Sequence, residues 1–137
     1  MASSFLLPTY KIIEMTKRLL FLDDLRYPID AYHYTKQDIF LRDDWEIVRN
    51  YHQFVSSILE EGLPEFISFD HDLADEDYLE SDFHEIPEKT GYECAKWLIN
   101  YCMDHNAELP KFFSHSMNPV GKENIESLLN NYKKLTR

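Results

Sequence analysis

Four short runs rich in apolar residues recur along the chain, and each is followed by polar residues. The first of them, residues 18–22 (RLLFL), is apolar at consecutive positions, which is typical of a strand buried on both faces of a parallel sheet. The other three runs contain fewer apolar side chains, but polar residues follow them in the same way. We therefore predict strands over residues 18–22, 45–49 (WEIVR), 65–69 (EFISF) and 111–114 (KFFS).

Helical periodicity fills the stretches between and after these runs. The segment Tyr51–Glu61 repeats apolar residues at helical spacing and is followed by Gly62, a typical helix stop. Residues 90–93 (TGYE) have the form of a capping box, and Asn118 before Pro119 has the pattern of a helix start. The apolar faces of the three helices are Phe54, Val55, Ile58 and Leu59; Cys94, Ala95, Leu98, Ile99, Cys102 and Met103; and Ile125, Leu128, Leu129 and Tyr132.

Strands that alternate with helices predict an α/β fold. We expect three layers, with a mostly parallel four-stranded sheet and flanking helices. Residues 25–44 show no clear period and are expected to form an irregular loop or a short helix. The domain is expected to span residues 18–137, with residues 1–17 as an N-terminal extension.

Composition and charge narrow the function classes. The chain has 137 residues, 44% of them hydrophobic, which is enough for a folded core. With 14 Lys+Arg against 25 Asp+Glu, its formal net charge of -11 argues against broad binding to a nucleic-acid backbone. Nine of the 25 Asp and Glu residues lie in residues 70–88, which hold no Lys or Arg. Most of these acids are expected to be solvated, as charge runs usually are.

The expected compartment is the cytoplasm. No apolar run approaches the about 20 residues that span a membrane, and the first residues do not resemble a secretory signal. Cys94 and Cys102 are eight positions apart in one predicted helix, about 12 Å at the helical rise, so they cannot form a disulfide with each other. Reduced cysteines are the rule for cytoplasmic proteins.

Acidic pairs follow two of the predicted strands. Asp23 and Asp24 come after the first, and Asp70 and Asp72 after the third, where period-two spacing predicts that they point the same way. Ligands of open α/β sheets bind outside the carboxyl ends of the strands. Four carboxylates there are suited to Mg²⁺ or Mn²⁺. The alternative for each Asp is an ordinary turn or helix-cap role.

Histidine and hydroxyl side chains join this edge. His115 and Ser116 follow the fourth strand, and His71 lies between the two aspartates after the third. Because histidine titrates near neutral pH, His115 is the first general acid/base candidate and His71 the second. Asn118 has two open roles, as a helix N-cap or as a contact to substrate.

Four strings occur in an order that resembles a known family. LFLDD followed by Arg26 and Pro28, then ISFDHDL, KTGYECAKWL and HSMNPVG, resemble the cyclic-phosphate-processing receiver-like domains of bacteria and phages over residues 18–132. The resemblance implies the receiver or flavodoxin-like fold of response regulators. It also implies action on 2′,3′-cyclic phosphates, on RNA ends or nucleotides.

Positions carried over from receivers suggest roles. Asp23 and Asp24 resemble the metal-binding pair, Asp70 the central phosphoryl-accepting aspartate, and Ser116 the hydroxyl that contacts phosphate. The lysine that follows a receiver's fifth strand has no match in a four-stranded chain. We expect the positive charge for phosphate to come from Arg26, Arg49 or Lys122.

The leading hypothesis is a metal-dependent phosphoesterase that processes a cyclic phosphate. Asp70 would be nucleophile or ligand, and its partner would be a nucleotide or an RNA end, not a membrane or a long nucleic-acid backbone. The rival is a receiver-like module that binds a phosphorylated or cyclic nucleotide ligand without turnover. A metal-free acid/base pair of His71 and His115 leaves the aspartates unexplained. A phosphatase of the haloacid dehalogenase type would need its DxD string after the first strand rather than the third.

Overall fold

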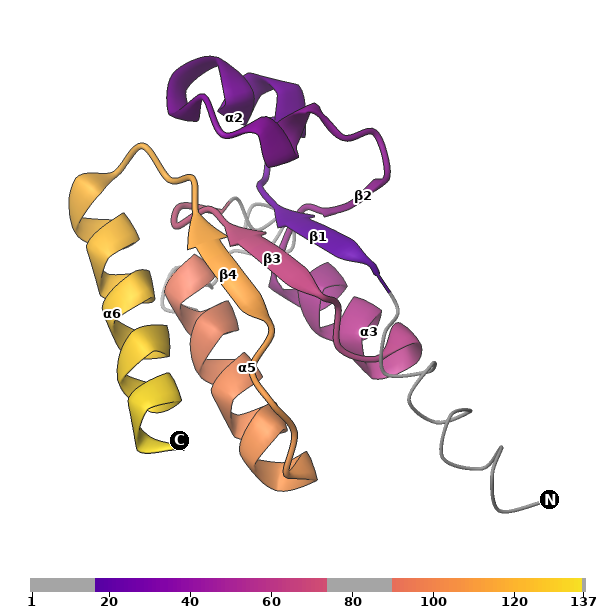
Figure 1. Cartoon of the computed structure of the whole chain (residues 1–137), viewed down its shortest axis with the longest axis vertical. Coiled ribbons are helices and arrows are strands. Elements are labelled where there is room, and N and C mark those ends of the chain that lie inside the picture. Colours follow the sequence, from indigo (N-terminus) through magenta and orange to yellow (C-terminus); the bar gives the residue numbers. More distant parts are fainter. Residues whose placement is uncertain (1–16, 74–89, 137) are drawn as a thin grey trace, which may run out of the picture.

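The computed structural model of the protein describes residues 17–73 and 90–136, which form a parallel sheet covered by helices on both faces (Figure 1). The four predicted strands are confirmed, the first three one residue shorter than predicted and the fourth with the predicted bounds. The elements are β1 (Leu19–Leu22), α2 (Pro28–Thr35), the 3₁₀ helix η1 (Asp38–Leu41), β2 (Trp45–Val48), α3 (Tyr51–Glu61), β3 (Phe66–Phe69), α5 (Gly91–His105), β4 (Lys111–Ser114) and α6 (Pro119–Leu135). The predicted acidic segment after Leu73 and the N-terminal extension lie outside the described residues, apart from Lys17.

The strand order is β2-β1-β3-β4, and every neighbouring pair is parallel. The chain moves outward from β1 to β2 and then in the opposite direction to β3 and β4. Because parallel crossovers are right-handed, the reversal puts α2 on one face of the sheet and α3 and α5 on the other. The expected three-layer α/β architecture is therefore confirmed (Figure 1).

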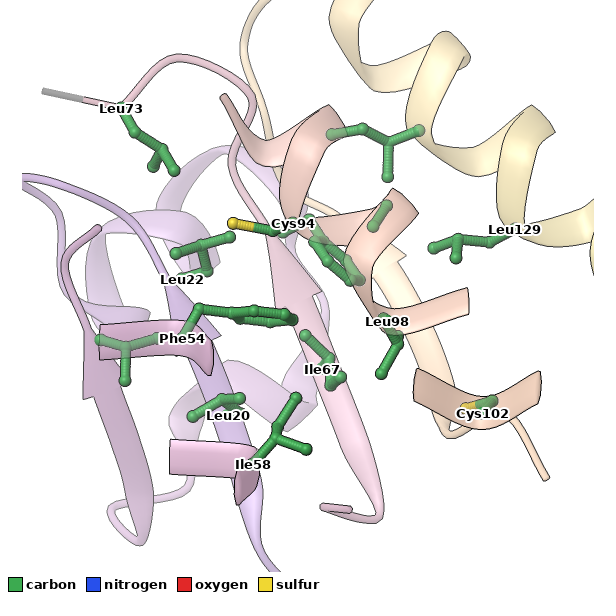
Figure 2. Packing of buried hydrophobic residues seen from close by; sticks show 14 residues of the cluster. Leu20, Leu22, Phe54, Ile58, Ile67, Leu73, Cys94, Leu98, Cys102 and Leu129 are labelled. Carbon is green, nitrogen blue, oxygen red and sulfur yellow. The ribbon is translucent and has the colours of Figure 1, made fainter. Parts of the chain in front are cut away.

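The larger core lies under α3, α5 and α6 (Figure 2). Leu20 and Leu22 point into it from β1, while Phe21 between them points to the other face. Each helix contributes most of the apolar stripe that its sequence predicts, but Leu59 and Met103, which were expected on these faces, are exposed. Both cysteines are free and buried in this core. The helical residues fully buried in this core are Phe54, Ile58, Cys94, Ala95, Leu98, Cys102, Ile125 and Leu129.

The smaller core lies under α2 and η1. Phe21 packs against Phe40 and Trp45 with ring centroids 6.0 and 5.8 Å apart. These two helices occupy the segment for which the sequence predicted a loop or a short helix. Helix α2 begins because Pro28 suits the first turn and the Asp30 side chain accepts a hydrogen bond from the Tyr27 amide at 2.8 Å.

Helix α6 also completes the open edge of β4. Ser114 would meet a further strand in a wider sheet, but its amide instead donates to Glu126 Oε2 at 3.0 Å and its carbonyl accepts from Lys122 Nζ at 2.6 Å. Lys122 and Glu126 also pair with each other at 3.0 Å. Two side chains thus satisfy one edge residue and obstruct strand addition there. No helix in the described ranges is long and apolar enough to cross a membrane.

Candidate active site at the carboxyl end of the sheet

Three buried polar side chains meet where β1, β3 and β4 end. Ligand atoms of Asp23, Asp70 and His115 all lie within 4.8 Å of one another, and the three residues are at most 4% exposed. The sheet ladder extends one residue past each strand: the Asp70 amide donates to Leu22 O at 2.9 Å, and the His115 amide to Phe69 O at 3.0 Å. Strand register therefore fixes these side chains as neighbours.

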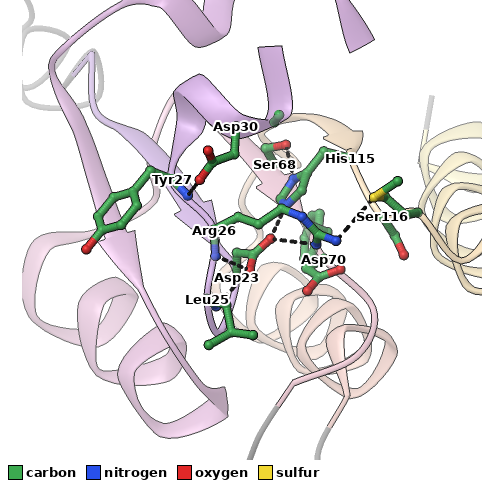
Figure 3. Close-up of polar contacts among 12 residues, drawn as sticks. Asp23, Leu25, Arg26, Tyr27, Asp30, Ser68, Asp70, His115 and Ser116 are labelled. Carbon is green, nitrogen blue, oxygen red and sulfur yellow. Dashed lines mark hydrogen bonds and ion pairs between the residues drawn. The ribbon is translucent and has the colours of Figure 1, made fainter. Parts of the chain in front are cut away.

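Asp23 is held at both of its oxygens. Oδ1 accepts hydrogen bonds from the amides of Leu25 and Arg26 at 2.9 and 2.8 Å, and Oδ2 accepts one from His115 Nε2 at 2.9 Å (Figure 3). Burial would raise the pKa of Asp23, but the hydrogen bonds from His115, Arg26 and Leu25 outweigh it and lower the pKa to about 2. Asp23 is thus a stable anion.

Asp70 is the opposite case. Its carboxylate receives one hydrogen bond from the described residues, from the His71 amide to Oδ1 at 2.8 Å. Burial, and then the negative charges of Asp23 and Asp24, raise the pKa of Asp70 to about 7 despite the opposing effects of the His71 amide and Arg26. Such a carboxyl is poorly satisfied as an anion and gains from a cation.

Arg26 brings positive charge to this site. Its NH1 lies 3.6 Å from Asp23 Oδ2, its NH2 contacts Met117 Sδ at 3.2 Å, and its side chain is about one-third exposed. The guanidinium also lies over the ring of Tyr34, 5.8 Å from the centroid. Arg26 therefore bridges the loops after β1 and β4 and keeps part of its donor fork open to solvent.

The His115 ring lies beneath the site rather than at its mouth. Nε2 bonds to Asp23, Nδ1 lies 2.7 Å from Ser68 Oγ, and the ring stacks on Phe21 with centroids 4.4 Å apart. Burial lowers the pKa of His115, which outweighs the opposing effect of Asp23. With both nitrogens engaged and no exposed side-chain surface, the ring has no direct access to a substrate.

The family comparison agrees with this geometry. Residues 18–131 match the family model described as the cyclic-phosphate processing receiver domain. The chain belongs to this family. No curated protein and no solved structure matches it. The receiver or flavodoxin-like fold that the sequence suggested is accordingly established for this receiver domain.

Asp72 and His71 of the receiver domain stand apart from the cluster. The expectation that Asp72 points the same way as Asp70 is wrong, because β3 ends at Phe69 and the chain bends at His71. The exposed Asp72 accepts from Asn118 Nδ2 at 3.5 Å, and its Oδ1 lies 3.0 Å from His71 Nδ1. The His71 ring lies so close to Gly121 that a Cβ there would overlap it.

The predicted phosphate-binding residues divide into two groups. Ser116 is buried next to β4 and its Oγ accepts the Asn118 amide at 3.1 Å. Asn118 is the N-cap of α6, with Oδ1 accepting the Gly121 amide at 3.0 Å, which confirms that alternative for it. Arg49 supports the loop after β1, where its NH1 donates to Asp23 O and Arg26 O at 3.0 and 2.7 Å.

Lys122 is turned to the sheet edge by its contacts with Ser114 O and Glu126. Its ammonium also lies 4.2 Å from the centroid of the Phe113 ring. Among the predicted cations, Arg26 is the one that the receiver domain pairs with a cluster carboxylate. Asp24 is half-buried beside the cluster and acts on Asp70 through its charge.

Three residues of the site were not predicted as site residues from the sequence. Ser68 contacts His115, and Tyr34 of α2 donates to the His115 carbonyl at 2.5 Å. Gly91 lets α5 approach the site, since a Cβ there would overlap the Asp70 carbonyl oxygen. Ser68 carried a signal, as a hydroxyl within an otherwise apolar strand, and Gly91 carried one as one of three glycines. Nothing in the sequence pointed to Tyr34.

Proposed function

We propose that this receiver domain opens 2′,3′-cyclic phosphates on nucleotides or RNA ends, with the help of Mg²⁺ or Mn²⁺. The observation that carries the proposal is the state of Asp70. It is a carboxylate 4% exposed, with one hydrogen bond from the described residues and two acidic neighbours. A buried anion of this kind is stabilised by a bound cation.

The donor set fits a hard divalent ion. Asp23 and Asp70 bring carboxylate oxygens together, and Asp24 adds negative charge beside them. Carboxylate oxygens that leave room for water and phosphate are what Mg²⁺ takes in phosphate-processing sites. His115 fits less well as a ligand, because both ring nitrogens already have partners. The proposed ligands are therefore Asp23 and Asp70, with Asp24 adding charge nearby, and without Asp72.

The side chains supply the remaining functions. Arg26 is proposed to bind the phosphate oxygens with the exposed part of its fork, which suits bidentate contact. Ser116 precedes Met117, which Arg26 contacts, and is proposed as a further donor to phosphate. A bound divalent ion would neutralise the phosphate and help to activate water. In the overall reaction water adds to phosphorus, one ring P–O bond breaks, and the released sugar oxygen takes up a proton.

The test is hydrolysis of 2′,3′-cyclic nucleotides and of RNA with a cyclic-phosphate end, in Mg²⁺, Mn²⁺ or EDTA. Asp70→Asn is expected to lower kcat/KM at least about 100-fold, the range in which a principal ligand or nucleophile acts. Asp72→Asn is the matched control, since Asp72 is exposed and outside the cluster. Metal-independent turnover, or equal loss in both variants, would contradict the proposal.

A binding module without turnover is the second candidate. It is favoured by Lys122, whose ammonium is bound to Ser114 O and Glu126 and so does not replace the lysine of signalling receivers. Calorimetry with a 2′,3′-cyclic nucleotide separates the two candidates. Binding that Arg26→Gln weakens, with no product in any metal, would support the module and exclude the phosphoesterase.

A further inference from the structure

Beneath the candidate site, three polar side chains form one series of hydrogen bonds, with Ser68 in β3, His115 directly after β4 and Asp23 directly after β1. Ser68 Oγ of β3 lies 2.7 Å from His115 Nδ1, and His115 Nε2 lies 2.9 Å from Asp23 Oδ2 (Figure 3). All three residues are at most 1% exposed. Ser68 points to the α2 side of the sheet because Ile67 and Phe69, its neighbours in β3, point into the larger core.

The direction of the hydrogen bonds follows from the chemistry of the groups. Asp23 already accepts two backbone amides, so it acts as a carboxylate, and a carboxylate can only accept. His115 Nε2 must therefore be protonated, and its N–H donates the hydrogen bond to Asp23. A neutral ring then has a bare Nδ1, to which the Ser68 hydroxyl donates.

The surroundings leave the ring one orientation. Phe21 stacks on it at 4.4 Å, and Phe40 meets it edge-on with centroids 6.1 Å apart. Tyr34 holds the His115 backbone through a 2.5 Å hydrogen bond to its carbonyl. A flipped or rotated ring would leave two buried nitrogens without partners, which is costly.

The hydrogen-bonded series Ser68–His115–Asp23 resembles a nucleophilic Ser-His-Asp triad in composition but not in placement. Ser68 is fully buried within a strand at the centre of the sheet, so no substrate reaches its hydroxyl. Solvent is nearest at the Asp23 end, where Asp70 lies and where the Arg26 side chain is about one-third exposed. Any effect of Ser68 and His115 on chemistry must therefore pass through Asp23.

We propose that Ser68 and His115 are positioning residues, which fix the Nε2–H tautomer of His115 and thereby the place of the Asp23 carboxylate opposite Asp70. The effect on metal and phosphate rests on the proposed function. Without the Ser68 hydroxyl, the bare nitrogen is buried unsatisfied, and the other tautomer places a lone pair against Asp23. Loss of such an outer partner commonly weakens a metal site about 10- to 100-fold.

Nitrogen-15 NMR of the full chain reads the ring of His115 directly, assigned through its own backbone and Cβ correlations. At about pH 7.5 the wild type is expected to show a bare Nδ1 and a protonated Nε2. A protonated Nδ1 in the wild type would overturn the proposal, whatever the behaviour of any variant.

Substitutions then separate positioning from packing. Ser68→Ala is expected to lose the single tautomer signature and to weaken Mn²⁺ binding, measured by calorimetry, at least about tenfold. Ser68→Thr keeps the hydroxyl and is expected to restore both. Ser114→Ala is the control, because Ser114 is equally buried in the adjacent strand but bonds through Oγ to the Phe69 carbonyl.

A folded Ser68→Ala protein with the wild-type ring signature would refute the positioning role, as would Ser114→Ala causing the same loss. If Ser68→Ala does not fold, the wild-type tautomer and the Ser68→Thr protein still decide the matter. If the wild type binds no Mn²⁺ and turns over no cyclic phosphate, the proposed function fails. The ring signature of wild type and Ser68→Ala then still tests the hydrogen-bonded chain by itself.

Discussion

Replacing Asp70 by asparagine is expected to make the metal-free protein more stable at alkaline pH. The amide side chain keeps an oxygen that can accept the His71 amide at the position of Oδ1, but it removes the charge that burial and Asp23 disfavour. Folding raises the pKa of Asp70 from 3.8 to about 7. The shift corresponds to about 4 kcal/mol at about 1.36 kcal/mol per unit, an upper bound because the site can relax.

The sign of the pH dependence follows from the raised pKa. The native state favours the protonated carboxyl, so this contribution to stability is complete below pH 3.8 and is lost as the pH rises through about 7. Asparagine does not titrate. The stability difference between Asp70→Asn and wild type should therefore be near zero at about pH 4 and grow to roughly 2–4 kcal/mol in favour of the variant at about pH 8.

Thermal unfolding in EDTA from about pH 4 to about pH 8 measures this difference. The variant should melt roughly 5–15 °C above the wild type at about pH 8. Asp72→Asn, at an exposed carboxylate, should follow the wild type at every pH. Excess Mg²⁺ should raise the melting temperature of the wild type but not of Asp70→Asn. A stability difference that is flat with pH, or a variant less stable than wild type at the alkaline end, would refute the electrostatic reasoning.

Three further substitutions test the packing and charge of the site. Gly91→Ala should destabilise the fold by about 2 kcal/mol or more in denaturant unfolding, because its Cβ would overlap the rigid backbone carbonyl of Asp70. The Cβ of Gly121→Ala would lie nearest to Cγ, Cβ and Cδ2 of His71, so adding His71→Gly, which removes all three atoms, should restore part of the lost stability, and absence of rescue would contradict the packing. Arg26→Gln should raise KM for a cyclic nucleotide about tenfold or more, measured in initial-rate assays. An unchanged KM would contradict the proposed contact of Arg26 with phosphate.

The backbone of the fold could be predicted from local patterns. The strand β1 is buried at all four positions, and the caps of α5 and α6 are the residues that the sequence indicates, Thr90 and Asn118. Helix α2 was not predicted clearly because Ala31 and Tyr32 pack in the small core around Phe21, while its apolar residue Ile29 is exposed. Such a helix depends on tertiary contacts more than on its own periodicity.

The candidate site was predictable as a place but not as a set of contacts. The rule that ligands bind at the carboxyl ends of parallel strands locates Asp23, Asp70 and His115 without any coordinates. The fate of Asp72 depends on a bend at His71, which the alternation rule for strands does not foresee. The burial of His115 depends on Phe21, which is distant in sequence and faces the same side of the sheet.

The two central carboxylates differ because the fold distributes its hydrogen-bond donors unequally. Asp23 takes donors from two amides and His115, with Arg26 nearby, while Asp70 receives one amide. Their pKa values are consequently driven apart, to about 2 and about 7, as in sites where neighbouring carboxyls serve different roles. Asp23 is stabilised by the protein itself, so its charge is a fixed part of the structure. Asp70 is the carboxyl whose state depends on what binds beside it, and a cation carrying a phosphate is the proposed ligand that would keep it an anion below neutral pH as well.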